Sequence, residues 1–441
     1  SQCIKQYVKA NNKYLKDFDK TKPENYLLYV DANNLYGWAL SQNLPYSDIK
    51  WMDPKTYSKE EWQETILELT GEEDYGYILE VDLGYPTKLH ENHKDLPLAP
   101  EHYKNKLSTT LLDKTEYVVH SRNLKFYLEQ GMVLKHVNRV LAFDQKPFMK
   151  EYIDFNTNMR TKATSDFEKD FYKLMNNSVF GKSMENVRNR CDIKLGNEEF
   201  SMKQAKKTNF KCFNIFDENC IASHMYKQKV KFNKPIYIGF SVLDLSKLLM
   251  YEFYYNKLKK YDPDLNLCYM DTDSYFLEMT KDPYKIIKEN IDEFDTSDYP
   301  KDHECFTNKN KKVIGKFKDE LNGEILEEFC GLRSKMYSYK YLDKNPVKCK
   351  GIKKSVVNKT INIENLKRCL FEDKEEYREM TCIRSYKHEL YTITINKLAL
   401  SSKDDKRVVL ENKIDTVPYG YNKEAKSDIL DLLNTLGNFD I

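Results

Sequence analysis

Cysteine pairs, long apolar runs and a recognisable secretion signal are all lacking from this 441-residue sequence. None of its 10 cysteines forms a Cys-x-x-Cys pair or lies at zinc-finger spacing from a histidine, which argues against a structural zinc site. The isolated His90-x-x-His93 lies in a polar stretch and is interpreted as chance. No uncharged apolar run approaches the length of a membrane span. We therefore expect an intracellular protein with reduced thiols and no membrane partner.

Net charge is also small, at +2, so overall charge does not indicate a nucleic-acid-binding protein. No internal repeat or low-complexity tract is found. The sequence does contain 40% hydrophobic residues, 33 Tyr and 22 Phe, which predicts a folded chain of two or three subdomains. The charge is unevenly distributed, because nine Lys or Arg and a single acid, Asp343, lie between Gly331 and Thr360. Such a run usually forms a solvated face, but it would also suit a phosphate backbone.

Asp271 and Asp273 lie between two apolar, aromatic-rich runs, residues 265–268 and 275–279, which predict a β-hairpin. In an extended backbone their side chains point the same way and Thr272 points the opposite way. Like charges placed together repel unless a cation lies between them, so a divalent metal is the simplest explanation. A polar turn remains the alternative. An EF-hand does not fit, because aromatic residues stand where an oxygen ligand and the required glycine should be.

Another carboxylate follows a predicted strand, residues 26–30, and precedes the turn-forming residues 32–37. An aspartate at the end of a buried apolar strand normally needs a partner, so Asp31 is a candidate metal ligand. The alternative is that Asp31 caps a strand-to-helix turn.

A helix is predicted from the capping box at Ser165–Glu168 to a stop at Gly181. Helical spacing gives it a basic face and an apolar face, and the apolar face is expected to pack against the core. The basic face carries Lys169, Lys173, Asn177 and Phe180, and the apolar face carries Phe167, Phe171, Leu174 and Ser178. Arg160 and Lys162 precede the cap and extend the basic track. The alternative is an ordinary amphipathic surface helix whose lysines are solvated.

The remaining segments are expected to be structural. Residues 1–22 are predicted to be helical or loosely ordered, 77–81 and 116–119 to be strands, 121–131 and 242–259 to be helices, 188–231 to be an excursion from the core, 282–310 to be a polar loop, and 333–339 to be a strand with Lys335, Tyr337 and Tyr339 on one face. The helix over 242–259 is apolar and should be buried.

Taken together, these features fit nucleotidyl transfer. That reaction needs carboxylates to hold two divalent ions about 3.5–4 Å apart, cations to hold a triphosphate, and a basic surface for the nucleic-acid backbone. The candidates are Asp31, Asp271 and Asp273 for the metals, Arg160, Lys162, Lys169 and Lys173 for the triphosphate, and residues 331–360 for the backbone. A reverse transcriptase or RNA polymerase would have adjacent aspartates, whereas Thr272 separates them here.

These motifs resemble those of the family B DNA polymerases, in the protein-primed branch. The family's D-x-x-S-L-Y-P, K-x-x-x-N-S-x-Y-G, Y-x-D-T-D-S and K-x-Y motifs correspond to Asp31–Gly37, Lys173–Gly181, Tyr269–Ser274 and Lys335–Tyr337. The third matches without a difference, whereas Asn34, Gly37 and Phe180 depart from the first two. Because Phe180 lacks the hydroxyl of Tyr, we expect sugar selection or fidelity to differ. The sequence is most similar to polymerases of Maverick/Polinton elements and related viruses.

The resemblance implies a role for each motif residue. Asp31 and Asp273 would bridge two Mg²⁺ ions, or Mn²⁺ in their place, with the Ala32 carbonyl as a further ligand and Asp271 beside the primer end. Tyr36 would exclude a 2′-hydroxyl, Lys162, Lys169 and Lys173 would hold the triphosphate, and Asn177 and Phe180 would contact the nascent base pair. DNA contacts would come from Asn34, Ser178, Gly181, Thr272, Lys335, Tyr337 and Lys350. The implied partners are primer–template DNA, dNTPs and a terminal protein primer, in the nucleus or at the site of viral or element replication.

The implied fold is a mixed α+β right hand with an antiparallel-sheet palm, helical fingers and a small thumb. Its expected divisions are a palm in two parts, 1–50 and 232–350, fingers at 151–185, a thumb at 351–441, an insertion at 51–150 that resembles the terminal-protein region, and a second insertion at 186–231 linked to strand displacement. The family's amino-terminal exonuclease has no counterpart in this sequence, so we expect no 3′–5′ exonuclease activity and a chain that is a piece of a longer protein. The alternative function is a truncated or domesticated polymerase-like module that binds nucleic acid without catalysis.

Overall fold

The computed structural model describes residues 1–386 and 389–422. Its architecture is mixed α+β, as predicted, and the largest sheet in the described part of the chain has ten strands. The main path of this sheet runs β1-β13-β14-β3-β17-β18-β19, and neighbouring strands on it are antiparallel. The strands are β1 (Gln2–Cys3), β13 (Asn266–Asp271), β14 (Ser274–Met279), β3 (Tyr26–Ala32), β17 (Leu326–Arg333), β18 (Met336–Tyr341) and β19 (Val347–Cys349). Off this path lie β2 (Tyr7–Lys9), β15 (Phe294–Asp295) and β16 (Phe317–Asp319).

Residues 2–3 and 7–9 belong to this sheet, so the prediction of a helical or loosely ordered stretch over 1–22 is wrong for them, and residues 11–22 form turns and loop without a helix. Gln2 and Cys3 pair with β13, and β2 pairs with β17. The segment is too short and polar to show strand periodicity by itself. Its order comes from long-range pairing, which leaves Cys3 fully buried.

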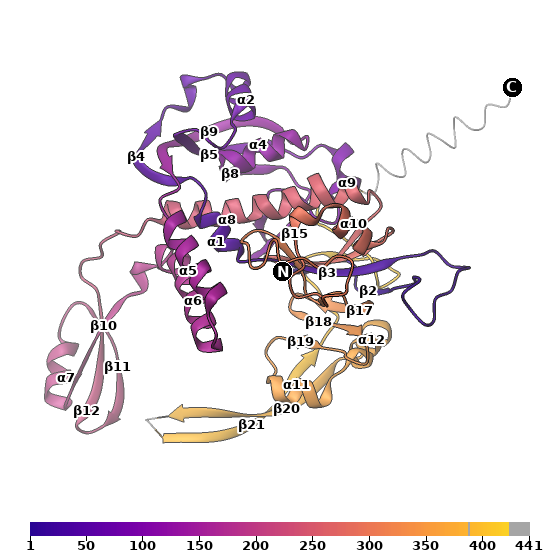
Figure 1. The fold of residues 1–441 in the computed structure, drawn as a ribbon. Coiled ribbons are helices and arrows are strands. Elements are labelled where there is room, and N and C mark those ends of the chain that lie inside the picture. The colour runs from indigo at the N-terminus through magenta and orange to yellow at the C-terminus, as the bar shows by residue number, and fades with distance from the viewer. Residues whose placement is uncertain (387–388, 423–441) are drawn as a thin grey trace.

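Helix α8 (Ile236–Tyr251) covers one face of the central sheet, and it continues as a π-helical segment, Glu252–Leu258, and as α9 (Lys259–Tyr261). Val242 and Leu245 are fully buried, which confirms the prediction of a buried apolar helix. The helix begins several residues earlier than predicted, directly after Pro235. Figure 1 shows α8 running between the central sheet below and a second sheet above.

The second sheet is four-stranded and antiparallel, in the order β4-β9-β5-β8. Its strands are β4 (Leu44–Met52), β5 (Tyr75–Gly84), β8 (Lys114–His120) and β9 (Val133–Lys146), and the same region contains the helices α2 (Lys59–Glu68), α3 (His90–His93) and α4 (Ser121–Glu129). Strands β6 (Glu101–Tyr103) and β7 (Lys106–Ser108) pair with each other as a separate two-stranded sheet. The two strands and the helix predicted in this region are confirmed. The Asp244 carboxylate of α8 accepts a hydrogen bond from the His120 backbone N–H at 2.8 Å, which ties this sheet to α8.

Two helices, α5 (Lys150–Lys162) and α6 (Asp166–Ser183), project from the body of the molecule (Figure 1). The predicted capping box at Ser165 is present, but α6 continues through Gly181 to Ser183. The prediction that the apolar face packs is also wrong, because Phe167 and Leu174 are 78% and 61% exposed. Helix α5 packs instead on the side of α6 that carries Asn176, since the Asn176 amide donates to Thr157 of α5.

Residues 191–226 form a small separate module, made of β10 (Cys191–Gly196), α7 (Glu198–Ala205), β11 (Phe210–Asp217) and β12 (Cys220–Tyr226). Its three strands form a sheet of their own, in the order β10-β12-β11, and Figure 1 shows it away from the central sheet. Glu185 joins both ends of the module, because its carboxylate contacts Arg190 at 2.8 Å and Lys234 at 3.1 Å.

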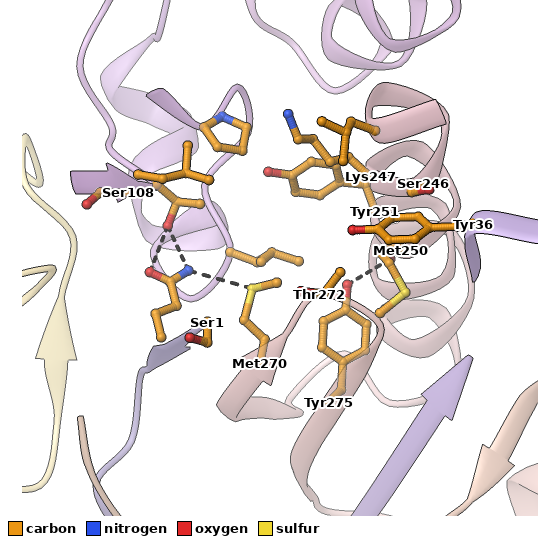
Figure 2. A pocket seen from close by; sticks show the side chains of 16 residues that line it. Ser1, Tyr36, Ser108, Ser246, Lys247, Met250, Tyr251, Met270, Thr272 and Tyr275 are labelled. Carbon is orange, nitrogen blue, oxygen red and sulfur yellow. Dashed lines mark hydrogen bonds between the residues drawn. The ribbon is translucent and has the colours of Figure 1, made fainter. Parts of the chain in front are cut away.

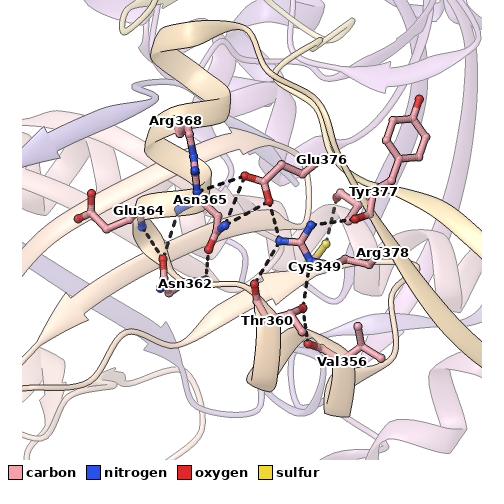
Figure 3. Close-up of polar contacts among 11 residues, drawn as sticks. Cys349, Val356, Thr360, Asn362, Glu364, Asn365, Arg368, Glu376, Tyr377 and Arg378 are labelled. Atoms are coloured by element: carbon pink, nitrogen blue, oxygen red, sulfur yellow. Dashed lines mark hydrogen bonds and ion pairs between the residues drawn. The ribbon is translucent and has the colours of Figure 1, made fainter.

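The segment after the central sheet contains α11 (Lys354–Thr360), α12 (Ile363–Glu372) and the hairpin β20 (Glu376–Tyr386) and β21 (Glu389–Leu400). The Glu376 carboxylate joins these pieces by accepting hydrogen bonds from Arg378 at 2.6 Å and from Asn365 at 3.2 Å (Figure 3). The chain then returns to the central sheet through β22 (Val408–Val409) and β23 (Thr416–Val417), where the Thr416 hydroxyl donates to the Ile4 carbonyl. Residues 387–388 and 423–441 of the predicted thumb lie outside the described residues.

The predicted polar loop over 282–310 is more ordered than expected. It contains α10 (Pro283–Glu289) and strand β15, and the side chain of Asp295 is buried. All 10 cysteines lie in the described residues and none forms a disulfide. No helix in the described ranges is long and apolar enough to cross a membrane.

Candidate active site

Three aspartates from distant parts of the sequence line one cavity of about 590 Å³. Strand pairing brings them together, because Asp31 of β3 lies opposite Ser274 of β14. The Ala32 backbone N–H also donates to the Asp273 carbonyl at 2.7 Å. Asp31, Asp271 and Asp273 therefore meet at the edge where β3 ends and the β13–β14 hairpin turns.

The hairpin was predicted correctly, but its tip differs from the extended geometry that was expected. Asp271 pairs with Ser274, which leaves Thr272 and Asp273 as a two-residue turn. Thr272 has a φ of 54°, so the backbone reverses there. The carboxylates of Asp271 and Asp273 reach the same cavity through this turn and not through strand alternation.

Burial and mutual repulsion make ionisation of these carboxyl groups costly. The pKa of Asp31 is raised to about 8, mainly by burial and then by the charges of Asp273 and Glu320, while those of Lys173 and Lys318 oppose the rise. Burial is also the largest cause of the raised pKa of Asp273. The positive charges of the neighbouring lysines therefore do not offset the cost of ionising Asp31 and Asp273.

Glu320 and Lys318 were missed by the sequence analysis. Both come from the short β16 region, and Lys318 pairs with Asp31 across the β3–β16 ladder. No motif marks this segment, so only the strand pairing reveals its position. Its order depends on β3, which lies far away in the sequence.

The donor set suits Mg²⁺. In residues 1–386 and 389–422 no group of three or more His, Cys, Asp or Glu side chains is arranged to hold a metal ion by itself. An ion at this site would therefore be held by fewer protein ligands. Mg²⁺ in phosphate-transfer sites is bound by one or two carboxylates together with substrate oxygens, which is the number that Asp31 and Asp273 provide. Their uncompensated charge fits a divalent cation, and Ala32 ends β3 beside them.

The predicted phosphate-binding lysines lie at different distances from the carboxylates. Lys173 is near enough for its charge to lower the pKa of both Asp31 and Asp273. Lys169 lies one helical turn away and pairs with Asp166 at 3.2 Å. Lys162 is exposed at the last residue of α5. The structure therefore brings Lys173 to the carboxylates and leaves the other two farther along the helices.

Tyr36 contacts Phe180, with ring centroids 4.7 Å apart, so residues of the first two motifs meet in space. Tyr36 lies on the short helix α1 (Leu35–Leu40), whose first turn is capped by Asn34. A Cβ at Gly37 would collide with the Asn34 side chain, which explains why glycine suits this position. Asn177 and Ser178 are exposed on α6.

Beyond Tyr36 lies a second, mainly apolar cavity of about 230 Å³. Figure 2 shows Tyr36 beside Met250 on one wall, with Thr272 and Met270 of the hairpin below. The Tyr275 hydroxyl donates to the Met250 carbonyl at 2.9 Å and fixes the hairpin against α8. The hairpin tip and Tyr36 thus rest on the same rigid helix.

Lys335 lies in the β17–β18 turn with a φ of 59°, so the predicted strand over 333–339 is interrupted there. Its side chain contacts the Asp271 carboxylate at 2.9 Å. Tyr337 packs on Tyr269 with ring centroids 4.5 Å apart. Lys335, Tyr337, Lys348 and Lys350 line the same cavity as the three aspartates. Part of the basic segment 331–360 therefore lies directly beside the carboxylates.

The sequence matches a known protein family over more than half of its length. Residues 12–260 match the family described as DNA polymerase type B, organellar and viral. The chain belongs to this family. No curated protein matches the sequence at a significant level.

Solved structures of Phi29 DNA polymerase share the fold of this type B polymerase. The ternary complex of Phi29 DNA polymerase with primer-template DNA and incoming nucleotide superimposes with a TM-score of 0.53 at 16% identity, covering 90% of this chain and 61% of that chain. Its binary complex with primer-template DNA gives a TM-score of 0.51 at 15% identity, with the same coverage. This chain therefore spans about three fifths of the length of the polymerase that it resembles.

Proposed function

We propose that this type B polymerase adds dNTPs to a primer 3′-hydroxyl under the direction of a DNA template, by two-metal nucleotidyl transfer. The observation that carries the proposal is the convergence of Asp31, Asp271 and Asp273 in one cavity beside Lys173. Family membership supports it, because Asp31 and Lys173 lie within residues 12–260, which match the family. Asp271 and Asp273 lie beyond that range and are supported by the resemblance of residues 269–274 to the polymerase motif.

Asp31 and Asp273 would hold the ions, and bound Mg²⁺ would activate the attacking hydroxyl and neutralise the leaving pyrophosphate. Lys173 of α6 lies near the same carboxylates. It would bind a phosphate of the nucleotide that reacts there. Tyr36 lies against Phe180 and would exclude a ribose 2′-hydroxyl by steric contact. Asp31 and Asp273 are held by the strands of the central sheet, and the helix of Tyr36 packs on α8, so these groups are aligned before substrate binds.

On the primer side, the Lys335 ammonium neutralises Asp271 and lies next to Tyr337. Lys348 and Lys350 extend this positive surface. We assign these groups to the phosphates and sugar of the primer terminus, where contacts position DNA without reading its sequence. The central sheet is then the palm, α5 and α6 are the fingers, and α11 to β21 are the thumb.

Protein priming is part of the proposal. The insertion between Leu44 and Lys146 forms a sheet that stands on the far side of α8 from the central sheet (Figure 1), and it would bind a terminal protein. The 191–226 module would serve strand displacement. Both roles rest on the likeness of the motifs to the protein-primed branch, and with them we propose that the protein acts at the site of viral or element replication.

The test is primer extension by the purified chain with Mg²⁺ and dNTPs. Asp273→Asn should lower the rate by about 10³-fold or more, because it removes a metal-binding charge while keeping the side-chain shape. Asp264→Asn is the matched control, since Asp264 is exposed and precedes the same hairpin at its other end. Equal activity of the wild type and Asp273→Asn would refute the catalytic assignment. DNA binding without extension by the wild type would favour the non-catalytic module.

A further inference from the structure

The segment 312–316 is bound to the turn that follows Asp31. The Asn33 backbone N–H donates to the Lys316 carbonyl at 2.8 Å, and the Gly315 N–H donates to the Asn33 carbonyl at 2.7 Å. The Asn33 side-chain amide donates to the Val313 carbonyl at 3.2 Å. Gly315 has a φ of 78° and lies against Trp38, so a side chain could not be accommodated there. The segment is therefore a fixed wall of the site.

Asp295 completes this attachment and sets the conformation of Lys312. Asp295 is 4% exposed, and its carboxylate accepts hydrogen bonds from the Asn33 side chain at 2.8 Å and from the Lys312 backbone N–H at 3.0 Å. Lys312 has a φ of 56°, which a non-glycine residue adopts only when its surroundings impose it. The backbone of Lys312 is thus held in a costly conformation that directs its side chain to the next cavity.

That cavity has a volume of about 130 Å³ and lies between the fingers helices and the palm. Arg160 of α5 and Lys312 line it from these two sides. Neither forms an ion pair in the described part of the chain, because the nearby Asp298 pairs with Lys318 at 2.7 Å and Asp295 is occupied by the contacts above. The Nε atom of Arg160 is buried and has no hydrogen-bond partner. Two cations and an unsatisfied buried donor are the features of a site for an anion.

The surrounding charge agrees with this. Burial and the positive charges of Arg160, Lys311 and Lys169 lower the pKa of Lys312, and the charge of Asp298 opposes them. Asp295 and Asp298 also line the cavity, but Asp298 pairs with Lys318 and Asp295 accepts from Asn33 and the Lys312 backbone, so neither pairs with the side chain of Lys312 or Arg160. Lys318 lines the same cavity and also acts on Asp31. Lys318 therefore links the carboxylate site to this cavity.

We propose that Lys312 and Arg160 bind the terminal phosphates of the incoming nucleoside triphosphate, from a palm wall and a fingers wall respectively. This rests on the proposed polymerase function, because the direction of the triphosphate follows from the reacting end lying at Asp31 and Asp273. Free pyrophosphate has the same oxyanion chemistry and would bind in the same place. Lys312 would contact the substrate directly, at phosphates away from the bond that is made.

The first test measures binding of pyrophosphate to the full chain by calorimetry in the presence of Mg²⁺. Lys312→Met and Arg160→Met should each weaken binding about tenfold, as expected for the loss of one charge-assisted hydrogen bond. Lys309→Met is the matched control, because Lys309 lies on the same loop but pairs with Asp292 at the surface. Lys312→Arg should restore binding. Equal affinity in wild type, Lys312→Met and Lys309→Met would overturn the proposal.

The second test is steady-state primer extension. Lys312→Met should raise the KM for dNTP about tenfold and leave kcat within twofold, because the contact is made equally in the ground and transition states. If its affinity for primer–template falls while pyrophosphate binding is unchanged, the site binds DNA phosphate and the proposal is wrong. If the wild type lacks extension activity but binds pyrophosphate in a Lys312-dependent way, the polymerase function fails and the anion site stands.

Discussion

At Asp31 the fold and the proposed site have opposite requirements, because burial favours the neutral carboxyl group and metal binding needs the ionised one. Its carboxyl group is held among other carboxylates at the end of a buried strand, and its pKa is raised to about 8. In an unfolded chain the same group has a pKa of about 3.9. Between these values the folded protein keeps a proton that the unfolded chain releases, so stability falls as pH rises from about 4 to about 8.

This gives a prediction for the protein without metal. In EDTA, Asp31→Asn should raise the melting temperature, and the gain over wild type should grow as pH rises from 5.5 to 8.5, because the variant has no charge to bury. Adding Mg²⁺ should raise the melting temperature of the wild type at pH 8.5 and leave that of Asp31→Asn nearly unchanged. Thermal unfolding followed by circular dichroism checks both effects.

Asp264→Asn serves as the control and should show no dependence of this kind, since Asp264 is exposed. A gain in Asp31→Asn that is the same at both pH values would contradict the prediction, because it would have no electrostatic origin.

At this scale the sequence predicted the residues that carry motifs and missed those that do not. Asp31, Asp273 and Lys173 were recognisable from spacing and resemblance, and they do converge. Glu320 and Lys312 were not, since nothing in their neighbourhood is unusual as sequence. They reach the site because β16 and the segment before it are bound to residues 31–33. Such pairing between distant segments has no local signal.

Helices α6 and α8 show the same contrast at the scale of elements. Periodicity correctly identified both as helices, and the apolar surface of α8 is buried as expected. For α6 the pattern showed which side chains share a face but not which face meets a neighbour. The partner helix α5 packs on the side of Asn176, and Phe167 and Leu174 remain in solvent.

The two helices should therefore respond differently to truncation. Leu245→Ala on α8 should lower the free energy of unfolding by about 2–5 kcal/mol, because it leaves a cavity in a closely packed core. Phe167→Ala on α6 should change it by less than about 0.5 kcal/mol, since that side chain is 78% exposed. Urea denaturation of both variants gives the measurement. A cost for Phe167→Ala similar to that of Leu245→Ala would mean that the apolar face of α6 is covered in solution.

The whole molecule consists of a central body and attached modules. The 191–226 module begins and ends at neighbouring points, since Cys191 pairs with Tyr226 and Glu185 joins Arg190 to Lys234. The burial of charge at Glu185 is slight, and its lowered pKa comes from hydrogen bonds to Arg190, Lys182 and Lys234. The two ends of the module therefore lie close together in the folded chain.

Excision of the module should accordingly leave the rest folded. A chain in which a short Gly-Ser linker replaces residues 191–226 should keep the thermal midpoint of the central sheet and extend a primer on single-stranded template. It should lose synthesis through a duplex, the role proposed for the module. Melting curves and extension on gapped and displaced templates check this. A truncated chain that still displaces a strand would contradict the proposal, and one that fails to fold would show that the module stabilises the body.

Strand β3 is hydrogen-bonded along both edges, to β14 on one side and to β16 and β17 on the other. The backbone of Asp31 is consequently fixed on both sides, and the strand pairing that aligns it is part of the sheet at the centre of the fold. Warming should not produce an intermediate that is folded yet inert. Activity and folded structure should be lost at the same temperature. The rate of primer extension, measured against temperature, should then follow the unfolding curve of the central sheet.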